Sequence, residues 1–374
     1  MRIVIDCSVL DRAITGTGRY LLNILEELPI QDKHNEYLLF ATIEPDVDKS
    51  FYRIVLSKPS LFPAKINSPI WLNFTLPQMI KKYKGDLLFA PNILLPVVDL
   101  NGIKCVSVIH DVIPIIYKEY YPYFYKKYLS LFLPRSLRRS DNIITVSEQS
   151  KKDIIKFYNI PSHKIVVAYN TASHTFKPRN LSDGIYPDII ERLSLPVKFL
   201  LYVGVIESRK NILGIISILD IVREQGSKLE LVMIGKPGYG SDKIIPEIQK
   251  RKQFIKYFKY LDDKALAYIY NLAFAFIFPS YYEGFGIPPL EAMQSGIPVL
   301  SSNTSALTEV VGDGGMLHSP EDHMGFAKDI LKLENDKNYY SLMKLKALNQ
   351  AKKFNVSETT QKIINIFDEL NSDL

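Results

Sequence analysis

The amino-acid sequence predicts an α/β fold with parallel sheets. Short apolar runs that suit buried strands alternate along the chain with segments that suit helices, as in proteins built from βαβ units. The clearest such unit, at 272–301, reads as a strand, a loop, a helix and a second strand. The chain has 374 residues, which is enough for two domains with separate cores.

The first half of the chain contains one such β/α series. Strands are expected at 2–7, 37–42, 87–90, 105–109, 142–146 and 164–168. A helix is expected over 21–28, and Ser147 begins a capping pattern that predicts the start of another helix. The polar stretch 169–178 predicts a linker, so we expect the first domain to cover residues 1–172.

The second half, 177–355, contains another β/α series and is predicted to form the second domain. Strands are expected at 198–204, 229–235, 272–278 and 297–301, and helices at 212–224, from about 262 and from 288. Pro288 and Pro289 suit a first helical turn, because the amide hydrogens that proline lacks would have no partner there. A final helix is expected at about 358–370.

The loop at 279–291 has the composition of a ligand-binding loop. Gly284 and Gly286 let backbone amides come close to a ligand, and the N-terminus of the helix that follows suits a phosphate. Glu283 and Glu291 would repel a diphosphate, so we expect one to bind a sugar hydroxyl and the other a ribose. The alternative is a solvated loop with two surface acids.

This stretch resembles a known family. Glu283 and Glu291, with seven residues between them in E-G-F-G-I-P-P-L-E-A-M, are similar to the E-x7-E motif of retaining, nucleotide-sugar-dependent glycosyltransferases of family 4. The surrounding residues resemble mannosyl- and rhamnosyltransferases that build surface polysaccharides such as the O-antigen of lipopolysaccharide. The resemblance implies the GT-B fold, in which two Rossmann-like domains face a cleft and a C-terminal helix, here 356–374, packs on the first domain.

The resemblance also implies the reaction. The enzyme would be a hexosyltransferase that moves a mannose-type sugar from a nucleotide diphosphate sugar, with GDP-mannose the expected donor. The acceptor would be a hydroxyl of a saccharide, expected to be lipid-linked, and the configuration at the anomeric carbon would be retained. Two alternatives stay open, namely a GT-B epimerase or hydrolase that needs no acceptor and a non-catalytic module that binds a sugar nucleotide.

Other site residues follow from the same resemblance. His110, at the end of a buried strand, would contact the transferred sugar. Asp111 would orient His110 or bind the acceptor. Arg209 and Lys210 would neutralise the donor diphosphate, since cations at a helix start conflict with the helix dipole unless an anion is bound. Many family members have an arginine directly after the preceding glycine, where this chain has Val205.

The remaining donor contacts are expected in three loops. Gly16, Gly18 and Arg19 match the family loop that faces the diphosphate, although a plain tight turn is the alternative. The base is expected to be read through backbone atoms near Tyr260 and Leu261. The glycine-rich loop of the motif would add Gly284, Phe285, Gly286 and Ile287.

Composition excludes several classes of protein. The net charge of +6 is low for a nucleic-acid-binding protein, so no nucleic-acid partner is expected. Cys7 and Cys105 lie in apolar runs and are expected to be reduced, as in the cytoplasm. Asp6 interrupts the first apolar run, so no signal peptide is expected, and no run approaches the ~18 residues of a membrane span. The six histidines lack metal-ligand spacing, so the enzyme is expected to need no metal or other cofactor.

One segment favours a membrane surface. Over 117–139, tyrosines, apolar residues and cations alternate at helical spacing. This pattern suits either a helix that lies on anionic lipid at the inner face of the cell membrane or a domain helix with a basic outer face. An NAD-dependent oxidoreductase is disfavoured, because Leu21 stands where the dinucleotide fingerprint has its third glycine.

Overall fold

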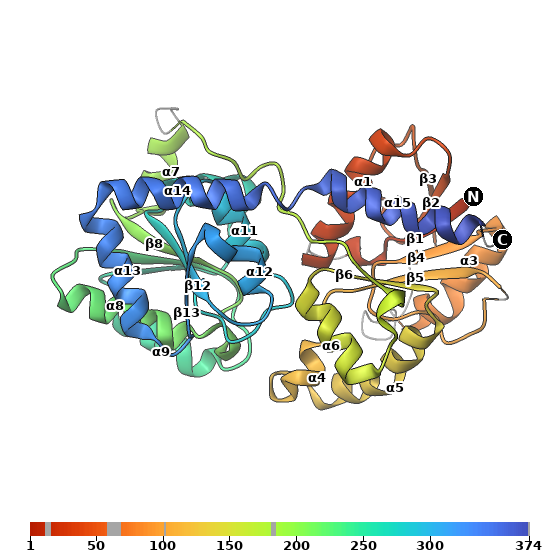
Figure 1. Cartoon of the computed structure of the whole chain (residues 1–374), viewed down its shortest axis with the longest axis horizontal. Coiled ribbons are helices and arrows are strands. Elements are labelled where there is room, and N and C mark those ends of the chain that lie inside the picture. The colour runs from red at the N-terminus through yellow and green to blue at the C-terminus, as the bar shows by residue number, and fades with distance from the viewer. Residues whose placement is uncertain (12–15, 58–68, 101, 181–184, 373–374) are drawn as a thin grey trace. The chain divides into compact units, whose positions relative to one another are not determined.

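The structure, a computed structural model, describes residues 1–11, 16–57, 69–100, 102–180 and 185–372 (Figure 1). The chain divides into two compact units, Met1–Thr171 with Asn355–Leu374 and Ala172–Phe354. Each unit is built on one β-sheet, and all neighbouring strands in both sheets are parallel. The predicted α/β fold with parallel sheets is therefore confirmed.

The first unit contains a seven-stranded sheet in the order β3-β2-β1-β4-β5-β6-β7. Its strands are β1 Arg2–Asp6, β2 Glu36–Ala41, β3 Arg53–Leu56, β4 Leu87–Ala90, β5 Lys104–Ile109, β6 Asn142–Thr145 and β7 Ile165–Val167. Strands covered on both faces appear in a sequence as apolar runs, which made the inner strands predictable. The edge strand β3 was missed, because three of its four residues are at least partly exposed.

Helices surround this sheet, and the last helix of the chain belongs to this unit. The helical segments are η1 Ser8–Leu10, α1 Gly16–Gln31, η2 Trp71–Thr75, α3 Leu76–Tyr83, α4 Ile113–Ile116, η3 Lys118–Tyr120, α5 Tyr123–Arg139, α6 Glu148–Tyr158, η4 Ser162–Lys164 and α15 Val356–Ser372. α15 lies beside α1 (Figure 1), and Thr359 Oγ1 donates a hydrogen bond to the carbonyl of Tyr169 at 2.9 Å. The predicted return of the C-terminal helix to the first unit is confirmed.

The structure corrects the single helix that the pattern over 117–139 suggested. A short 3-10 turn, η3, comes first, and α5 begins only at Tyr123. Pro122 is the reason, because proline forces the residue before it into an extended conformation. Tyr121 has φ −125° and ψ 146°, which interrupts helical geometry at that point.

The second unit contains a six-stranded sheet in the order β10-β9-β8-β11-β12-β13. Its strands are β8 Phe199–Val203, β9 Glu230–Ile234, β10 Ile255–Phe258, β11 Ala275–Phe278, β12 Val299–Ser302 and β13 Met316–His318. The two edge strands, β10 and β13, were not predicted, because most of their residues are only partly buried. The inner strands, which are almost wholly buried, overlap the apolar runs that predicted them. The strand expected at 272–278 begins only at Ala275, because Leu272 is the last residue of α10.

Helices cover both faces of the sheet in the second unit. They are α7 Ile185–Leu193, η5 Ser208–Lys210, α8 Ile212–Glu224, α9 Ser241–Lys250, α10 Asp263–Leu272, α11 Ile287–Gln294, α12 Leu307–Val311, η6 Gly312–Gly314, α13 His323–Asn335 and α14 Lys337–Ala351. α8 and α13 lie side by side (Figure 1). α8 has the predicted bounds, and Pro288 and Pro289 stand in the first turn of α11 as expected.

Candidate active site

Three residues singled out in the sequence meet in a buried ion cluster at the carboxyl edge of the second sheet. Glu283 follows β11, whereas Arg209 and Lys210 follow β8, the strand beside it. Oε1 of Glu283 accepts a hydrogen bond from Lys210 Nζ at 2.5 Å and lies 3.2 Å from Arg209 Nη1. Ser280 Oγ donates to the same oxygen at 2.6 Å. In open α/β sheets ligands bind at this edge, so the cluster is the leading candidate for the active site.

Arg209 has further partners that fix its guanidinium group. Nη2 lies 2.5 Å from Glu207 Oε1, and Nη1 donates to the backbone carbonyl of Tyr282. Arg209 and Glu283 are each only 7% exposed. Two cations therefore face two carboxylates, which is how a protein interior tolerates charge.

Arg209 and Lys210 precede the helix instead of starting it. They belong to η5, and Asn211, with φ 55°, separates that turn from α8 and caps the helix. Cations beside the start of a helix need a nearby anion to offset the helix dipole. In the structure, Glu283 is that anion.

The charges of the cluster shift the pKa values of its members. Burial raises the pKa of Glu283, but the charges of Lys210 and Arg209 and the hydrogen bonds from Lys210 and Ser280 outweigh burial, so the pKa lies below its ordinary value. Burial lowers the pKa of Lys210, and the charge of Glu283 offsets only part of that effect. Glu283 is therefore ionised at neutral pH.

Backbone hydrogen bonds join the loop after β8 to the loop after β9. The amide of Ile206 donates to the carbonyl of Lys236 at 2.9 Å, and the amide of Gly238 donates to the carbonyl of Ile206 at 2.9 Å. At Gly235 a Cβ atom would lie 1.8 Å from the carbonyl oxygen of Gly204, so only glycine fits there. Val205, where many family members have arginine, is 43% exposed in this joined pair of loops.

The glycine-rich loop after β11 leads directly into α11. Gly286 has φ +118°, and a Cβ atom there would lie 2.8 Å from Leu307 Cδ2, so a side chain would be strained and crowded. Gly284, Phe285 and Gly286 are buried, and Ile287 is the first residue of the helix. The Phe285 side chain packs edge-on against Phe354 with 5.6 Å between ring centroids.

Glu291, the second acid of the motif, is held by a different partner. Tyr270, on α10, donates from its hydroxyl to Glu291 Oε2 at 2.8 Å. Tyr270 is fully buried, and burial, followed by the charge of Glu291, raises its pKa well above the ordinary value. The carboxylate of Glu291 is thus positioned by the core of the unit.

Tyr260 and Leu261, expected near the base, follow β10 at the same edge of the sheet. Tyr260 is 70% exposed, and Lys236 Nζ lies 5.6 Å from the centroid of its ring. Leu261 is partly buried. The exposed ring and the cation offer a surface on which a planar group could stack.

In the first unit, His110 follows β5 at the carboxyl edge of the sheet. Its backbone carbonyl accepts a hydrogen bond from Ser150 Oγ at 2.9 Å, and its ring meets Tyr20 edge-on with 5.1 Å between centroids. Burial lowers the pKa of His110 to about 4, so the imidazole is neutral at neutral pH. Asp111 Oδ1 accepts from the amide of Ile113 at 2.9 Å, which ties that side chain to its own loop.

The structure corrects the loop expected around Gly16, Gly18 and Arg19. α1 begins at Gly16, so all three residues lie in the first turns of a helix, and Gly18 is buried there. The helix had been expected to start near Leu21, because glycine is a weak helix former. The amides of a first turn have no partner within the helix, so a phosphate contact is still chemically open to them.

One buried acid of the first unit was not recognised in the sequence. Asp6, at the end of β1, is fully buried and accepts hydrogen bonds from Trp71 Nε1 at 2.9 Å and from the amide of Ser8 at 3.0 Å. Asn92 Nδ2 lies 3.3 Å from its second oxygen. Burial raises the pKa of Asp6 despite these bonds. An acid at the end of a buried strand was the available signal, and Trp71 and Asn92 are too distant in sequence to be recognised as its partners.

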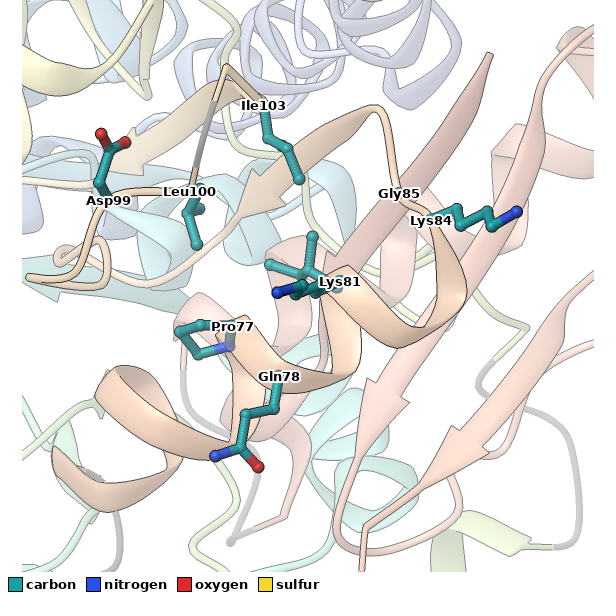
Figure 2. Close-up of a pocket in the computed structure, with 9 residues that line it drawn as sticks. Pro77, Gln78, Lys81, Lys84, Gly85, Asp99, Leu100 and Ile103 are labelled. Carbon is teal, nitrogen blue, oxygen red and sulfur yellow. The ribbon is translucent and has the colours of Figure 1, made fainter.

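The first unit also contains a hollow of about 420 Å³ (Figure 2). α3 forms one side, with Lys81 and Pro77 among the lining residues. Gly85 precedes β4 and Ile103 precedes β5, so the hollow lies at the amino ends of the strands. Ligands of open α/β sheets bind at the opposite edge, and we assign the hollow no role.

Among the residues that the structure describes, no set of three or more His, Cys, Asp or Glu side chains is placed so that it could hold a metal ion. Over the same residues, every helix is too short or too polar to cross a membrane.

Comparison with known proteins finds a glycosyltransferase family in each half of the chain. Residues 190–352 match the glycosyl transferases group 1, and residues 14–175 match Glycosyltransferase Family 4. The O-antigen chain mannosyltransferase B of Escherichia coli is 28% identical over 98% of this chain and 99% of its own length. The O-antigen chain mannosyltransferase RfbU of Salmonella typhimurium is 25% identical over 89% of this chain and 91% of its own length.

A solved structure shares the fold along the whole chain. Sucrose-phosphate synthase from Thermosynechococcus elongatus superposes with a TM-score of 0.77 at 17% identity and covers 100% of both chains. Together with the two parallel α/β units, this likeness defines a GT-B fold of the glycosyltransferase type. The chain belongs to the glycosyltransferases of group 1 and family 4 and is an enzyme that transfers glycosyl groups.

Proposed function

We propose that the protein is a retaining mannosyltransferase that moves mannose from GDP-mannose to a saccharide acceptor in O-antigen or related surface polysaccharide synthesis. Two relatives that match most of the chain are O-antigen mannosyltransferases, which supports both the sugar and the type of polymer. The observation that carries the proposal is the buried cluster of Glu283, Lys210 and Arg209. It fixes two cations beside a carboxylate at the edge of the sheet where ligands bind.

The cations would act on the leaving group. Departure of the nucleoside diphosphate builds negative charge on its oxygens, and fixed cations in a dry site stabilise that charge without reorganisation. Lys210 and Arg209 supply the cations. The amides of Gly284 to Ile287 and the first turn of α1, with Arg19, are the proposed further donors to the diphosphate.

The acids and the histidine would hold hydroxyl groups. Glu283, which is ionised at neutral pH, would accept hydrogen bonds from the transferred sugar. Glu291 would accept hydrogen bonds from the ribose. His110, neutral because its pKa is about 4, suits a neutral hydroxyl better than a phosphate. Asp111 is the proposed acceptor-side residue, and Tyr260 with Leu261 the proposed base region.

The low pKa of Glu283 also supports the chemistry. A carboxylate held by two cations is a weak base and a weak nucleophile, so it is poorly suited to take the acceptor proton. We propose that the acceptor oxygen bonds to the anomeric carbon on the face from which the diphosphate leaves. The carbon–oxygen bond to the diphosphate breaks, and the acceptor proton passes to a phosphate oxygen.

The acceptor is proposed to be lipid-linked, with α5 in contact with an anionic membrane at its cytoplasmic face. Tyr123, Phe124 and Leu131 are 60%, 84% and 69% exposed on this helix. Lys126 and Lys127 lie between them, and Lys127 Nζ is 5.4 Å from the ring centroid of Tyr123. Exposed aromatic rings mixed with lysines are typical of surfaces that lie on anionic lipid.

A nucleotide screen tests the proposed donor. The protein is melted with GDP, UDP, dTDP or ADP in the presence of a chelator, since the proposal needs no metal. Because binding stabilises the folded state by mass action, GDP should raise the melting temperature above the other three nucleotides. A response to UDP or dTDP alone would contradict the choice of GDP-mannose, and no response to any nucleotide would favour a decayed binding module.

A further inference from the structure

Two buried polar atoms of the first unit lack a hydrogen-bond partner and belong to rings in contact. They are the hydroxyl of Tyr20 and Nε2 of His110, for which no partner exists among the described residues. The rings meet edge-on, with 5.1 Å between centroids and 86° between planes. Tyr20 is only 1% exposed.

Such atoms call for an explanation. A buried polar group without a partner keeps the full cost of its lost hydration, so native structures contain few of them. Two such atoms on touching rings are harder to explain as independent defects of packing. Their position adds to the argument, because His110 directly follows β5 and lies at the edge of the sheet where ligands bind.

The chemistry of the pair indicates the kind of ligand. Burial raises the pKa of Tyr20 and lowers that of His110 to about 4, so both groups are neutral at neutral pH. A neutral phenol and a neutral imidazole offer no charge to a phosphate. Each can donate or accept one hydrogen bond, which suits an alcohol, a group that does both.

We propose that Tyr20 is a further substrate-contacting residue, whose hydroxyl binds one hydroxyl of the transferred sugar beside His110. The inference rests on the proposed function, because it takes the ligand to be a sugar donor. It assigns Tyr20 a direct part in selecting the donor. A site that binds a sugar hydroxyl in this way discriminates against a donor that lacks it, because the buried groups are then left unpaired.

The test compares Tyr20→Phe with the matched variant Tyr158→Phe. Tyr158 is also a tyrosine of the first unit whose buried hydroxyl lacks a partner among the described residues, but it is on α6 and not in ring contact with His110. Neither change removes an internal hydrogen bond, so neither should lower the melting temperature. With GDP-mannose, Tyr20→Phe should lose roughly five- to tenfold in kcat/KM, the size of one neutral hydrogen bond, whereas Tyr158→Phe should not.

Deoxy donors locate the contact. GDP-mannose analogues that each lack one sugar hydroxyl are compared with the parent donor on the wild type and on Tyr20→Phe. The wild type should discriminate against the analogue that lacks the bound hydroxyl, and Tyr20→Phe should discriminate several-fold less against that one analogue. The discrimination against the other analogues should not change.

Two outcomes would overturn the inference while leaving the proposed function intact. In one, the wild type transfers mannose but Tyr20→Phe keeps its full kcat/KM, which would mean that the hydroxyl binds only an ordered water. In the other, Tyr20→Phe loses activity equally towards every analogue, together with melting temperature, which would mean a structural role. If the wild type itself turns over no GDP-mannose, the proposed function has failed, and the inference fails with it.

Discussion

At Glu283, one carboxylate oxygen accepts hydrogen bonds from Lys210 and Ser280 and lies within ion-pair distance of Arg209. The same two cations are proposed to bind the donor diphosphate. Glu283 and the diphosphate therefore compete for the same positive charge, and binding of the donor would shift part of that charge away from the carboxylate. This competition predicts that removing the charge of Glu283 strengthens the binding of GDP but slows the transfer reaction.

Glu283→Gln should bind GDP more tightly than the wild type but turn over GDP-mannose more than tenfold more slowly. Loss of the carboxylate charge frees Lys210 and Arg209 for the diphosphate, whereas the sugar loses its ionised partner. Lys210→Ala should lose more than tenfold in turnover and also bind GDP more weakly. Calorimetry of GDP binding, beside a transfer assay, measures both effects, and weaker GDP binding by Glu283→Gln would contradict the competition.

His110 makes a prediction about pH and stability. Its pKa is about 4 when folded, against an ordinary value of 6.5, so between these values the unfolded chain binds the proton and the folded protein does not. The contribution of the neutral His110 to the free energy of unfolding is therefore fully present above about pH 6.5. It is lost as the pH drops towards 4, which lowers the free energy of unfolding by up to about 3 kcal/mol. His110→Gln should flatten the fall in unfolding free energy between pH 7 and pH 5. An unchanged slope would show that the imidazole is not buried as described.

At the scale of elements, the site depends on how a loop enters α11. Gly286 has a positive φ, and a Cβ atom there would also crowd Leu307. Gly226 offers a matched control, because it too has a positive φ but has open space around it. Gly226→Ala should cost about 1 kcal/mol of unfolding free energy from backbone strain alone.

Gly286→Ala should cost more than this control, because crowding adds to the strain. It should also weaken GDP binding, since the amides of the loop would move away from the ligand. Urea unfolding and GDP calorimetry on the two variants measure these effects. Equal losses of stability in both variants would show that Leu307 gives way at no cost.

α5 carries the prediction about the membrane. The double variant Lys126→Glu/Lys127→Glu should lose most of its sedimentation with vesicles of phosphatidylglycerol, because charge reversal removes the attraction to anionic lipid. Lys352→Glu/Lys353→Glu, an equal change of charge at exposed lysines of the second unit, should sediment like the wild type. Equal loss in both variants would reduce the effect to net charge, and binding of the wild type to uncharged vesicles would contradict an electrostatic contact.

At the scale of the whole molecule, the sequence predicted the buried elements well and the exposed ones poorly. The inner strands and α8 were found because full burial leaves a continuous apolar run. The partly exposed strands β3, β10 and β13 lack that run. The start of α1 was misplaced because Gly16 and Gly18 resemble a loop, and the break before α5 was missed because one proline decided it.

Only part of the candidate site could be predicted from the sequence, for a different reason. Glu283, Lys210 and Arg209 were each singled out, but Lys210 and Glu283 are separated by 73 positions, and their pairing depends on β8 and β11 being neighbours. The local sequence does not determine which strands are neighbours in the sheet. The unpartnered hydroxyl of Tyr20 could not be predicted either, because whether a buried group has a hydrogen-bond partner depends on the packed structure.

The most direct test of the account is the anomeric configuration of the product formed from GDP-mannose. The purified protein is incubated with GDP-mannose, a chelator and a saccharide acceptor, and the new linkage is examined by NMR spectroscopy. We expect acceptor-dependent release of GDP and a mannosyl linkage with the same configuration as the donor. An inverted linkage, or release of free mannose at a rate that does not depend on the acceptor, would contradict it.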